Sequence, residues 1–179
     1  MNPLIPLSVP NLSGNEQKYI LEVLQQGWVS SAGSSITAFE RKISEYLNVT
    51  DAAACQSGTA GLHLSLICCG IQPEDEVIVP TLTYIASVNP VKYIGAEQVF
   101  MDCDDGLCMD MDKLEDFITT ECELRNRTLI NKNTGRRISA VLVVHVFGNI
   151  ADMEKLMDLQ EKYGFMVIED ATEALGSYI

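Results

Sequence analysis

Basic residues are scarce in this chain. Its 12 lysines and arginines stand against 25 aspartates and glutamates, which gives a net charge of −13. Proteins that bind the phosphate backbone of a nucleic acid present clustered Lys and Arg side chains. Here the basic residues are scattered, and their one cluster, Arg136-Arg137 with Lys132 nearby, suits a hairpin or a loop. We therefore expect no nucleic-acid partner.

The sequence also lacks a long hydrophobic run. Its longest apolar runs, such as 140–144, have the length of a strand, whereas a helix that crosses a bilayer needs about 20 apolar residues. The N-terminus, Met1-Asn2-Pro3-Leu4, shows neither the basic region nor the small-residue cleavage site of a signal peptide. We expect no membrane partner and a cytoplasmic location.

No C-x-x-C pair occurs among the six cysteines, and without a signal peptide we expect free thiols that mostly fill the core. The acidic stretch 102–106, with Asp110 and Asp112, does not fit the EF-hand template. Its second and third acidic positions are adjacent, and position twelve is Lys113. We therefore expect no metal site.

Helix-like and strand-like segments alternate along the chain. Hydrophobic periodicity predicts helices over 16–26, 36–47, 59–69, 85–94, 112–119 and 152–163, and strands over 52–55, 76–79, 98–101, 140–146 and 165–168. Short apolar strands between helices of about ten residues are typical of βαβ units. The sequence therefore predicts an α/β fold of three layers, a mostly parallel sheet flanked by helices, with ligands at the carboxyl ends of the strands.

The first two helices carry further local signals. Ser13 and Glu16 have the spacing of a capping box at the start of the first helix. In the second helix, we expect an inward face made of Phe39, Ile43, Tyr46 and Leu47.

Small residues stand between the predicted strand 52–55 and the next helix, at Ser57-Gly58-Thr59. They let a ligand approach the backbone closely, and the first N–H groups of a helix have no internal acceptor, which favours an anion site. An ordinary helix cap by Ser57 or Thr59 is the simpler interpretation. The segment is neither a Walker loop nor a dinucleotide fingerprint, because G-x-x-x-x-G-K-[ST] and G-x-G-x-x-G are both absent.

Two ring side chains belong to the segments around later strands. Tyr84 follows the strand 76–79, where a flat heteroaromatic ligand could stack on it, although a half-buried core tyrosine is the simpler interpretation. His145, in the strand-like run 141–147, is a base or a ring contact, or else a hydrogen-bonded core histidine.

Asp170 is the most specific candidate for a functional residue, because Glu169-Asp170 ends a segment that is predicted to be a buried strand. A buried carboxylate is costly unless a cation or hydrogen-bond donors meet it. Asp170 could keep a bound pyridine nitrogen protonated, and a protonated pyridine is an electron sink for carbanion chemistry. A structural ion pair or a helix cap is the alternative. Glu173, three residues after Asp170, is expected to border the same ligand site.

Taken together, these segments resemble the DegT/DnrJ/EryC1/StrS family of nucleotide-sugar aminotransferases that depend on pyridoxal 5′-phosphate (PLP). The matching segments are in family order and cover nearly all of the chain: 27–33, 39–40, 57–60, 75–84, 144–148 and 169–171. The residue sequences of segments 6–16 and 170–177 are similar to those of the LegC-like branch of the family. Enzymes of this branch aminate C4 of a UDP-4-keto-6-deoxy-N-acetylhexosamine on the way to legionaminic acid or similar sugars.

The resemblance implies the large domain of a fold-type I aminotransferase, a homodimer with a shared active site and glutamate as amino donor. It implies that Gly58 and Thr59, next to Ser57, hold the cofactor phosphate and that Tyr84 stacks on its ring. It further implies that Asp170 bonds the pyridine nitrogen and that Glu173 lies near the ring substituents. Trp28 and Ser30 fall in a segment that the family uses around the substrate and the subunit contact.

The chain departs from the family at the Schiff-base lysine. In the family this lysine follows in a motif of the S-F-N-x-N-K type, whereas no lysine follows Lys162 here. We therefore expect residues 1–179 to be an incomplete large domain, without catalytic lysine or small domain, that does not turn over alone. Two alternatives stay open: a PLP-dependent sugar dehydratase, in which histidine replaces that lysine, and a non-catalytic fragment with a partial cofactor site.

Overall fold

The computed structural model describes residues 4–6 and 8–178. They form two compact units, which meet in the sequence between Ala54 and Cys55. Leu7, within the segment 6–16, lies outside the described residues. Among the described residues, no helix is both long and apolar enough to cross a membrane.

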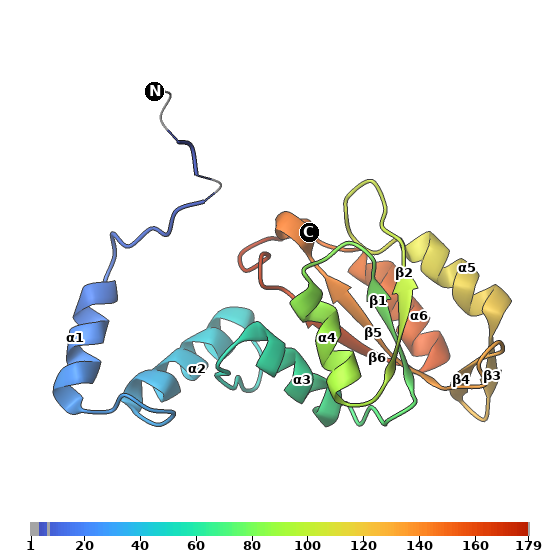
Figure 1. Cartoon of the computed structure of the whole chain (residues 1–179), viewed down its shortest axis with the longest axis horizontal. Helices are drawn as coiled ribbons and strands as arrows, with labels where there is room; N and C mark the ends of the chain where they lie inside the picture. The colour runs from blue at the N-terminus through green and yellow to red at the C-terminus, as the bar shows by residue number, and fades with distance from the viewer. Residues whose placement is uncertain (1–3, 7, 179) are drawn as a thin grey trace. The chain divides into compact units, whose positions relative to one another are not determined.

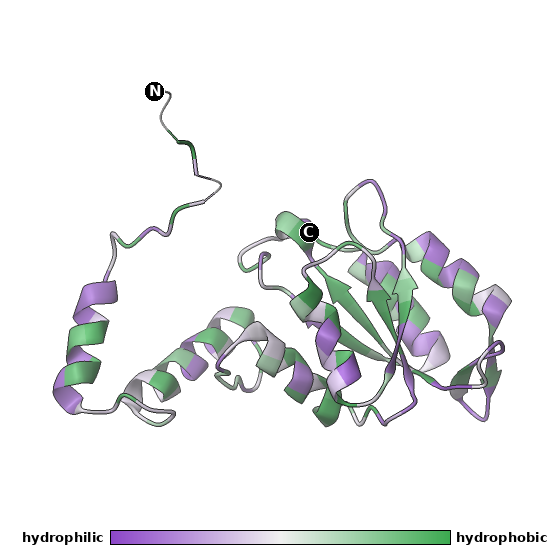
Figure 2. Cartoon of the chain, in the orientation of Figure 1, coloured by the Kyte–Doolittle hydropathy of each residue, from purple (hydrophilic) through white to green (hydrophobic). Residues whose placement is uncertain are grey.

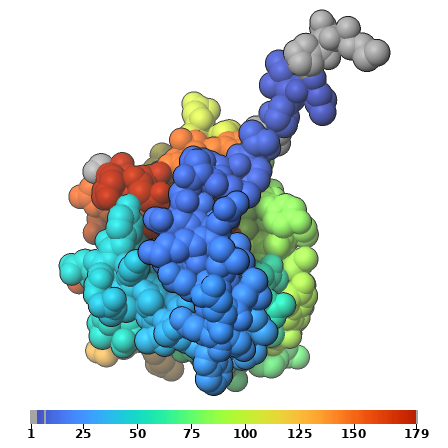
Figure 3. Space-filling model, turned by 90° about the vertical axis from the view of Figure 1, so that its left-hand side faces the viewer, coloured from blue at the N-terminus to red at the C-terminus, as the bar shows by residue number. Residues whose placement is uncertain are grey.

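The N-terminal unit contains two helices, α1 (Glu16–Gln26) and α2 (Ser34–Leu47). Both helices are amphipathic in sequence, but neither has a buried residue. The prediction that one face of α2 points inward is therefore wrong for this unit. Figure 3 shows the N-terminal unit in blue. The capping box is also wrong, because α1 begins after Asn15, whose side chain makes no cap bond. Periodicity identified the apolar faces but not what covers them.

The C-terminal unit is built on a four-stranded parallel sheet in the order β2-β1-β5-β6. The strands are β1 (Glu76–Pro80), β2 (Glu97–Met101), β5 (Ile138–Val144) and β6 (Met166–Asp170). The helices around it are α3 (Gly58–Cys68), α4 (Ile85–Tyr93), α5 (Met111–Glu121) and α6 (Met153–Tyr163), with a short 3₁₀ turn, η1 (Val146–Gly148). Figure 1 shows these elements around the sheet.

Alternate side chains of the central strands pack into two separate cores, one on each face of the sheet. Ile78, Val141 and Val143 join the core beneath α5 and α6. Val79 and Leu142, which alternate with these residues along the two strands, join the core beneath α3 and α4 on the opposite face. Every residue of β1 and β5 is buried, and Figure 2 shows these strands as a hydrophobic band. The predicted α/β fold of three layers is confirmed.

The structure differs from the expected elements at three places. A hairpin that was not predicted joins β3 (Cys122–Arg125) and β4 (Thr128–Asn131). Its two-residue turn, Asn126-Arg127, has positive φ at both residues, as the twist of a tight hairpin demands. No strand forms at 52–55, since none of the described strands pairs with it, and β6 is an edge strand rather than a buried one.

The cysteines are less buried than expected. All six lie in the described part of the chain and none forms a disulfide, but only Cys108 and Cys122 are buried. The interpretation as core residues is therefore wrong for the exposed Cys55 and Cys68, whereas the partly buried Cys69 packs against the core beneath α3 and α4. Desolvation, with the carboxylate of Glu76 nearby, raises the pKa of the Cys122 thiol to about 11. This thiol is thus protonated and unreactive near neutral pH.

One buried polar contact joins the sheet to the hairpin, and its loss should lower the stability of the fold measurably. Asn131 donates its side-chain N–H to Glu76 Oε2 at 2.8 Å, and both residues are buried. We expect Asn131→Ala to lower the free energy of unfolding by about 1–3 kcal/mol, because a buried carboxylate loses its donor. Denaturant unfolding measures the change. In a Glu76→Gln background the same substitution should cost less, and an equal cost in both backgrounds would contradict the account.

Candidate functional site

A cavity of about 570 Å³ opens at the carboxyl end of the sheet. It is lined by the loop after β1, by the ends of β5 and β6, and by the first turn of α3. From the neighbours β1 and β5 the sheet grows outward in opposite directions, to β2 on one side and to β6 on the other. Such a switch point is where open parallel sheets bind ligands.

The first turn of α3 offers backbone donors to this cavity. Ser57 is the N-cap residue, and its Oγ accepts from Ala60 N at 3.2 Å, so the simpler interpretation of this residue is confirmed. The N–H groups of Gly58 and Thr59, by contrast, meet no acceptor among the described residues. Gly58 and Thr59 both line the cavity. The cap and the anion site are therefore compatible, since they use different N–H groups.

Gly58 is not required by the packing of the chain itself. A Cβ placed there would meet only Thr172 Oγ1, at 3.7 Å, which is an ordinary contact. A side chain would therefore fit the fold but would lie beside Thr172, which lines the cavity. This open backbone suits the close approach of an anionic group.

Tyr84 lies at the N-cap position of α4, where the chain leaves β1. Its side chain is 78% exposed, and it lines the cavity. The alternative of a half-buried tyrosine that closes the core is therefore wrong. The ring offers a flat apolar face to a ligand in the cavity.

Asp170 ends β6 and is half-buried, so its position at a strand end is confirmed although the strand is not buried. Its Oδ2 accepts from Ser87 Oγ at 2.7 Å, and its Oδ1 accepts from Thr172 Oγ1 at 2.6 Å and from Thr172 N at 3.2 Å. No Lys, Arg or His among the described residues forms an ion pair with it. The structural ion pair is therefore wrong, and hydroxyl donors hold the carboxylate instead.

Glu173 lines the same cavity and fixes the turn beside it. Its Oε2 accepts from the backbone N of Phe147 at 2.8 Å. Phe147 has φ 55°, the left-handed region that a phenylalanine adopts at a cost, and its ring is 75% exposed at the cavity. The next residue, Gly148, has φ 83°, and a Cβ there would lie 3.2 Å from Glu173 O. The two segments are thus tightly interlocked.

His145 lies directly after β5 and is buried outside the cavity lining. Its Nδ1 accepts from Ala151 N at 3.2 Å, so the ring proton is on Nε2, which donates to Glu169 Oε2 at 3.1 Å. The hydrogen-bonded core histidine is therefore the interpretation that fits. A contact of His145 with substrate or subunit stays a prediction.

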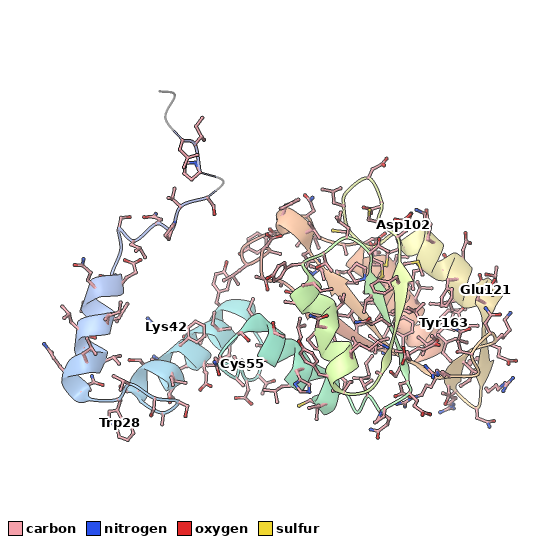
Figure 4. All side chains as sticks on the ribbon, viewed as in Figure 1. Trp28, Lys42, Cys55, Asp102, Glu121 and Tyr163 are labelled. Atoms are coloured by element: carbon pink, nitrogen blue, oxygen red, sulfur yellow. The ribbon has the colours of Figure 1, made fainter. Side chains whose placement is uncertain are left out.

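Trp28 and Ser30 belong to the N-terminal unit, in the loop between α1 and α2. Figure 4 shows Trp28 on this loop, and its side chain is 57% exposed. Gly33, with φ 145°, packs against it, since a Cβ there would lie 3.2 Å from Trp28 Cβ. Their role around a substrate or a second subunit stays a prediction.

Sequence reasoning missed two of the polar residues in the cavity, Ser87 and Thr172, and the wall residue Phe147. Ser87 lies one turn into α4, after Tyr84, where nothing in the local pattern distinguishes it from a helix-surface serine. Thr172 was overlooked between the two acidic residues 170 and 173, although Ser, Thr and Asp readily bond to neighbouring backbone in such turns.

The donors and acceptors of the cavity fit a flat ring with an anion at one end and a cationic nitrogen at the other. The α3 N–H groups suit the anion, Tyr84 suits the ring, and Asp170 suits the cationic nitrogen. The described lining contains no Lys, Arg or His. Nor do the described residues hold a cluster of His, Cys, Asp or Glu arranged for a metal ion.

Comparison with known proteins gives a family over almost the whole chain. The sequence profile of the DegT/DnrJ/EryC1/StrS aminotransferase family matches residues 10–179. A GDP-perosamine synthase of Caulobacter vibrioides is 42% identical over 176 residues, which are 98% of this chain and 43% of that protein. A UDP-4-amino-4-deoxy-L-arabinose–oxoglutarate aminotransferase of Shewanella sediminis is 34% identical, over 98% of this chain and 41% of that protein.

A solved structure that is similar in fold supports the same assignment as the sequence comparisons. Spr1654 of Streptococcus pneumoniae, in its PLP form, is 28% identical with a TM-score of 0.80, over 96% of this chain and 44% of that one. The cofactor predicted from the resemblance, PLP, is thereby confirmed for this fold and family. The chain spans less than half the length of the relatives that it matches.

The backbone at Phe147 predicts an unusual order of stability. Phe147→Gly and Phe147→Ala both remove the exposed ring, but only glycine adopts φ 55° without cost. We expect the glycine variant to be the more stable of the two by about 1 kcal/mol, measured by thermal or denaturant unfolding. If the alanine variant is equally or more stable, the turn is not strained.

Proposed function

Because the chain belongs to the DegT/DnrJ/EryC1/StrS aminotransferase family, we propose that it forms the cofactor-binding part of an enzyme that transfers an amino group to a nucleotide-linked keto sugar. The observation that carries this proposal is the meeting of three features in one cavity. They are the unpaired N–H groups at the start of α3, the exposed ring of Tyr84 and the carboxylate of Asp170.

Each feature has a role towards PLP in this proposal. The N–H groups of Gly58 and Thr59 hold the phosphate, with the helix dipole of α3 behind them. Tyr84 contacts the face of the ring, and Asp170 accepts the hydrogen bond of the protonated ring nitrogen. When bound, the cofactor supplies the electron sink for the chemistry.

Glu173 takes a second role in the proposal. One oxygen of its carboxylate, Oε2, receives the Phe147 N–H, which leaves Oε1 to face the ring substituents. The left-handed backbone of Phe147 then keeps its ring as an apolar wall of the cavity. These two residues thus orient the ring and keep water from one side of it.

The amine that binds the cofactor is proposed to come from the lysine of a later S-F-N-x-N-K type motif, which residues 1–179 do not contain. Glutamate as the amino donor, a homodimer and a cytoplasmic location are part of the same proposal. Trp28 and Ser30 are proposed to contact the substrate or the second subunit.

The sugar has two candidates, both keto sugars linked to a nucleotide. The sequences of segments 6–16 and 170–177, which resemble the LegC-like branch, support a UDP-4-keto-6-deoxy-N-acetylhexosamine as the substrate, aminated at C4 on a pathway to a legionaminic-acid-like sugar. The relative from Caulobacter vibrioides, named for a GDP sugar, supports a GDP-linked keto sugar instead. Glutamate-dependent amination of each keto sugar by the complete gene product, followed by mass spectrometry, distinguishes them.

Binding of pyridoxamine 5′-phosphate (PMP) to the chain tests the proposed cofactor site. PMP carries an amine instead of an aldehyde, so it cannot attach covalently to surface lysines. We expect Asp170→Asn to weaken PMP binding about tenfold or more, because the cationic ring nitrogen loses its charged partner. Fluorescence titration measures the affinity.

Asp116→Asn is the matched control, because it makes the same change of charge on the exposed surface of α5. It should leave the affinity unchanged. Equal weakening by both variants would reduce the role of Asp170 to a general effect of charge, and no binding by the unaltered chain would contradict the proposed site.

A further inference from the structure

We propose that Ser87 and Thr172 are positioning residues, which aim the carboxylate of Asp170 at the ring nitrogen of the cofactor. This inference rests on the proposed function, since it concerns the same cavity. It assigns a role to two side chains that the family resemblance leaves without one.

The three donors around Asp170 approach both of its oxygens. Ser87 Oγ lies 2.7 Å from Oδ2, and Thr172 places its Oγ1 2.6 Å and its N 3.2 Å from Oδ1. A carboxylate offers about four lone-pair sites. Three are therefore taken, and one on Oδ2 is left for a donor from the cavity.

The hydroxyl groups have a fixed direction of donation. Thr83 Oγ1 donates to Ser87 Oγ at 3.1 Å, and Ser87 has a single hydroxyl hydrogen, which goes to Asp170. Ser87 is 5% exposed, so water does not compete freely for this hydrogen. The backbone N of Ser87 bonds to Tyr84 O, which ties the same network to the residue proposed to contact the ring.

A local turn explains only part of this network. Thr172 follows Asp170 by two residues, and a side-chain bond over that spacing is common in turns. Ser87 comes from α4 and is 83 positions away from Asp170 in the sequence. Its contact brings together two elements on the same cavity and has no counterpart in turn geometry.

The consequence for a bound ring is electrostatic. Ser87 and Thr172 hold the carboxylate in one orientation, and no Lys, Arg or His among the described residues forms an ion pair with it. A charged, oriented acceptor is therefore ready for a protonated nitrogen, without reorganisation on binding. Removing either hydroxyl lets the carboxylate turn away or bind water instead.

The test compares PMP with its 1-deaza analogue, in which a C–H group replaces the ring nitrogen. We expect the unaltered chain to bind PMP more tightly than the analogue. Ser87→Ala and Thr172→Val should each weaken PMP binding about threefold to tenfold and leave the affinity for the analogue unchanged. Thr172→Ser, which keeps the hydroxyl, should restore the preference for PMP.

Thr119→Val is the matched control, because it removes a hydroxyl that bonds only within α5. It should leave both affinities unchanged. Thr172 is exposed, so Thr172→Val tests the claim even where Ser87→Ala destabilises the fold.

Two results would overturn the inference and leave the proposed function standing. In one, the unaltered chain prefers PMP and every variant keeps that preference. In the other, Ser87→Ala and Thr172→Val weaken both ligands equally, as a merely structural role requires. Equal binding of PMP and its analogue by the unaltered chain would instead contradict the proposed role of Asp170 itself.

Discussion

The parallel pairing of β1 with β5 is the constraint on which the rest of the site depends. These two strands are buried on both faces, and from them the sheet grows outward to β2 on one side and to β6 on the other. The pairing of β5 with β6 places Val144 beside Asp170, and His145 N extends it by bonding to Asp170 O at 3.1 Å. The apolar contacts of two cores thus fix where a polar carboxylate stands.

The cavity at this edge combines weak, preorganised groups rather than strong cations. Its described lining has two carboxylates, hydroxyl groups and open backbone N–H groups, and Tyr84 and Phe147 supply exposed rings. Such a lining discriminates by geometry, because its two carboxylates are held in place by hydrogen bonds from neighbouring residues. The network around Asp170 and the clamp of Glu173 on Phe147 both act in this way.

Much of this arrangement could be predicted from the sequence. The alternation of apolar segments predicts the parallel sheet, and Gly58, Tyr84 and Asp170 each lie where a chain enters or leaves an element. Ser87 could not be predicted as a partner of Asp170, because their contact spans 83 positions and depends on how α4 packs. The β3–β4 hairpin was missed because Arg127, unlike Asn126, is not a typical residue for positive φ. Likewise, an apolar face such as that of α2 does not say what covers it.

The central claim is that Asp170 keeps the nitrogen of a bound pyridine ring protonated. The ¹⁵N chemical shift of ring-labelled PMP bound to this 19.7 kDa chain measures that protonation directly. The account predicts the shift of a protonated pyridine near neutral pH, with a return to that of the neutral ring in Asp170→Asn. A bound ring with the shift of a neutral nitrogen in the unaltered chain would contradict it.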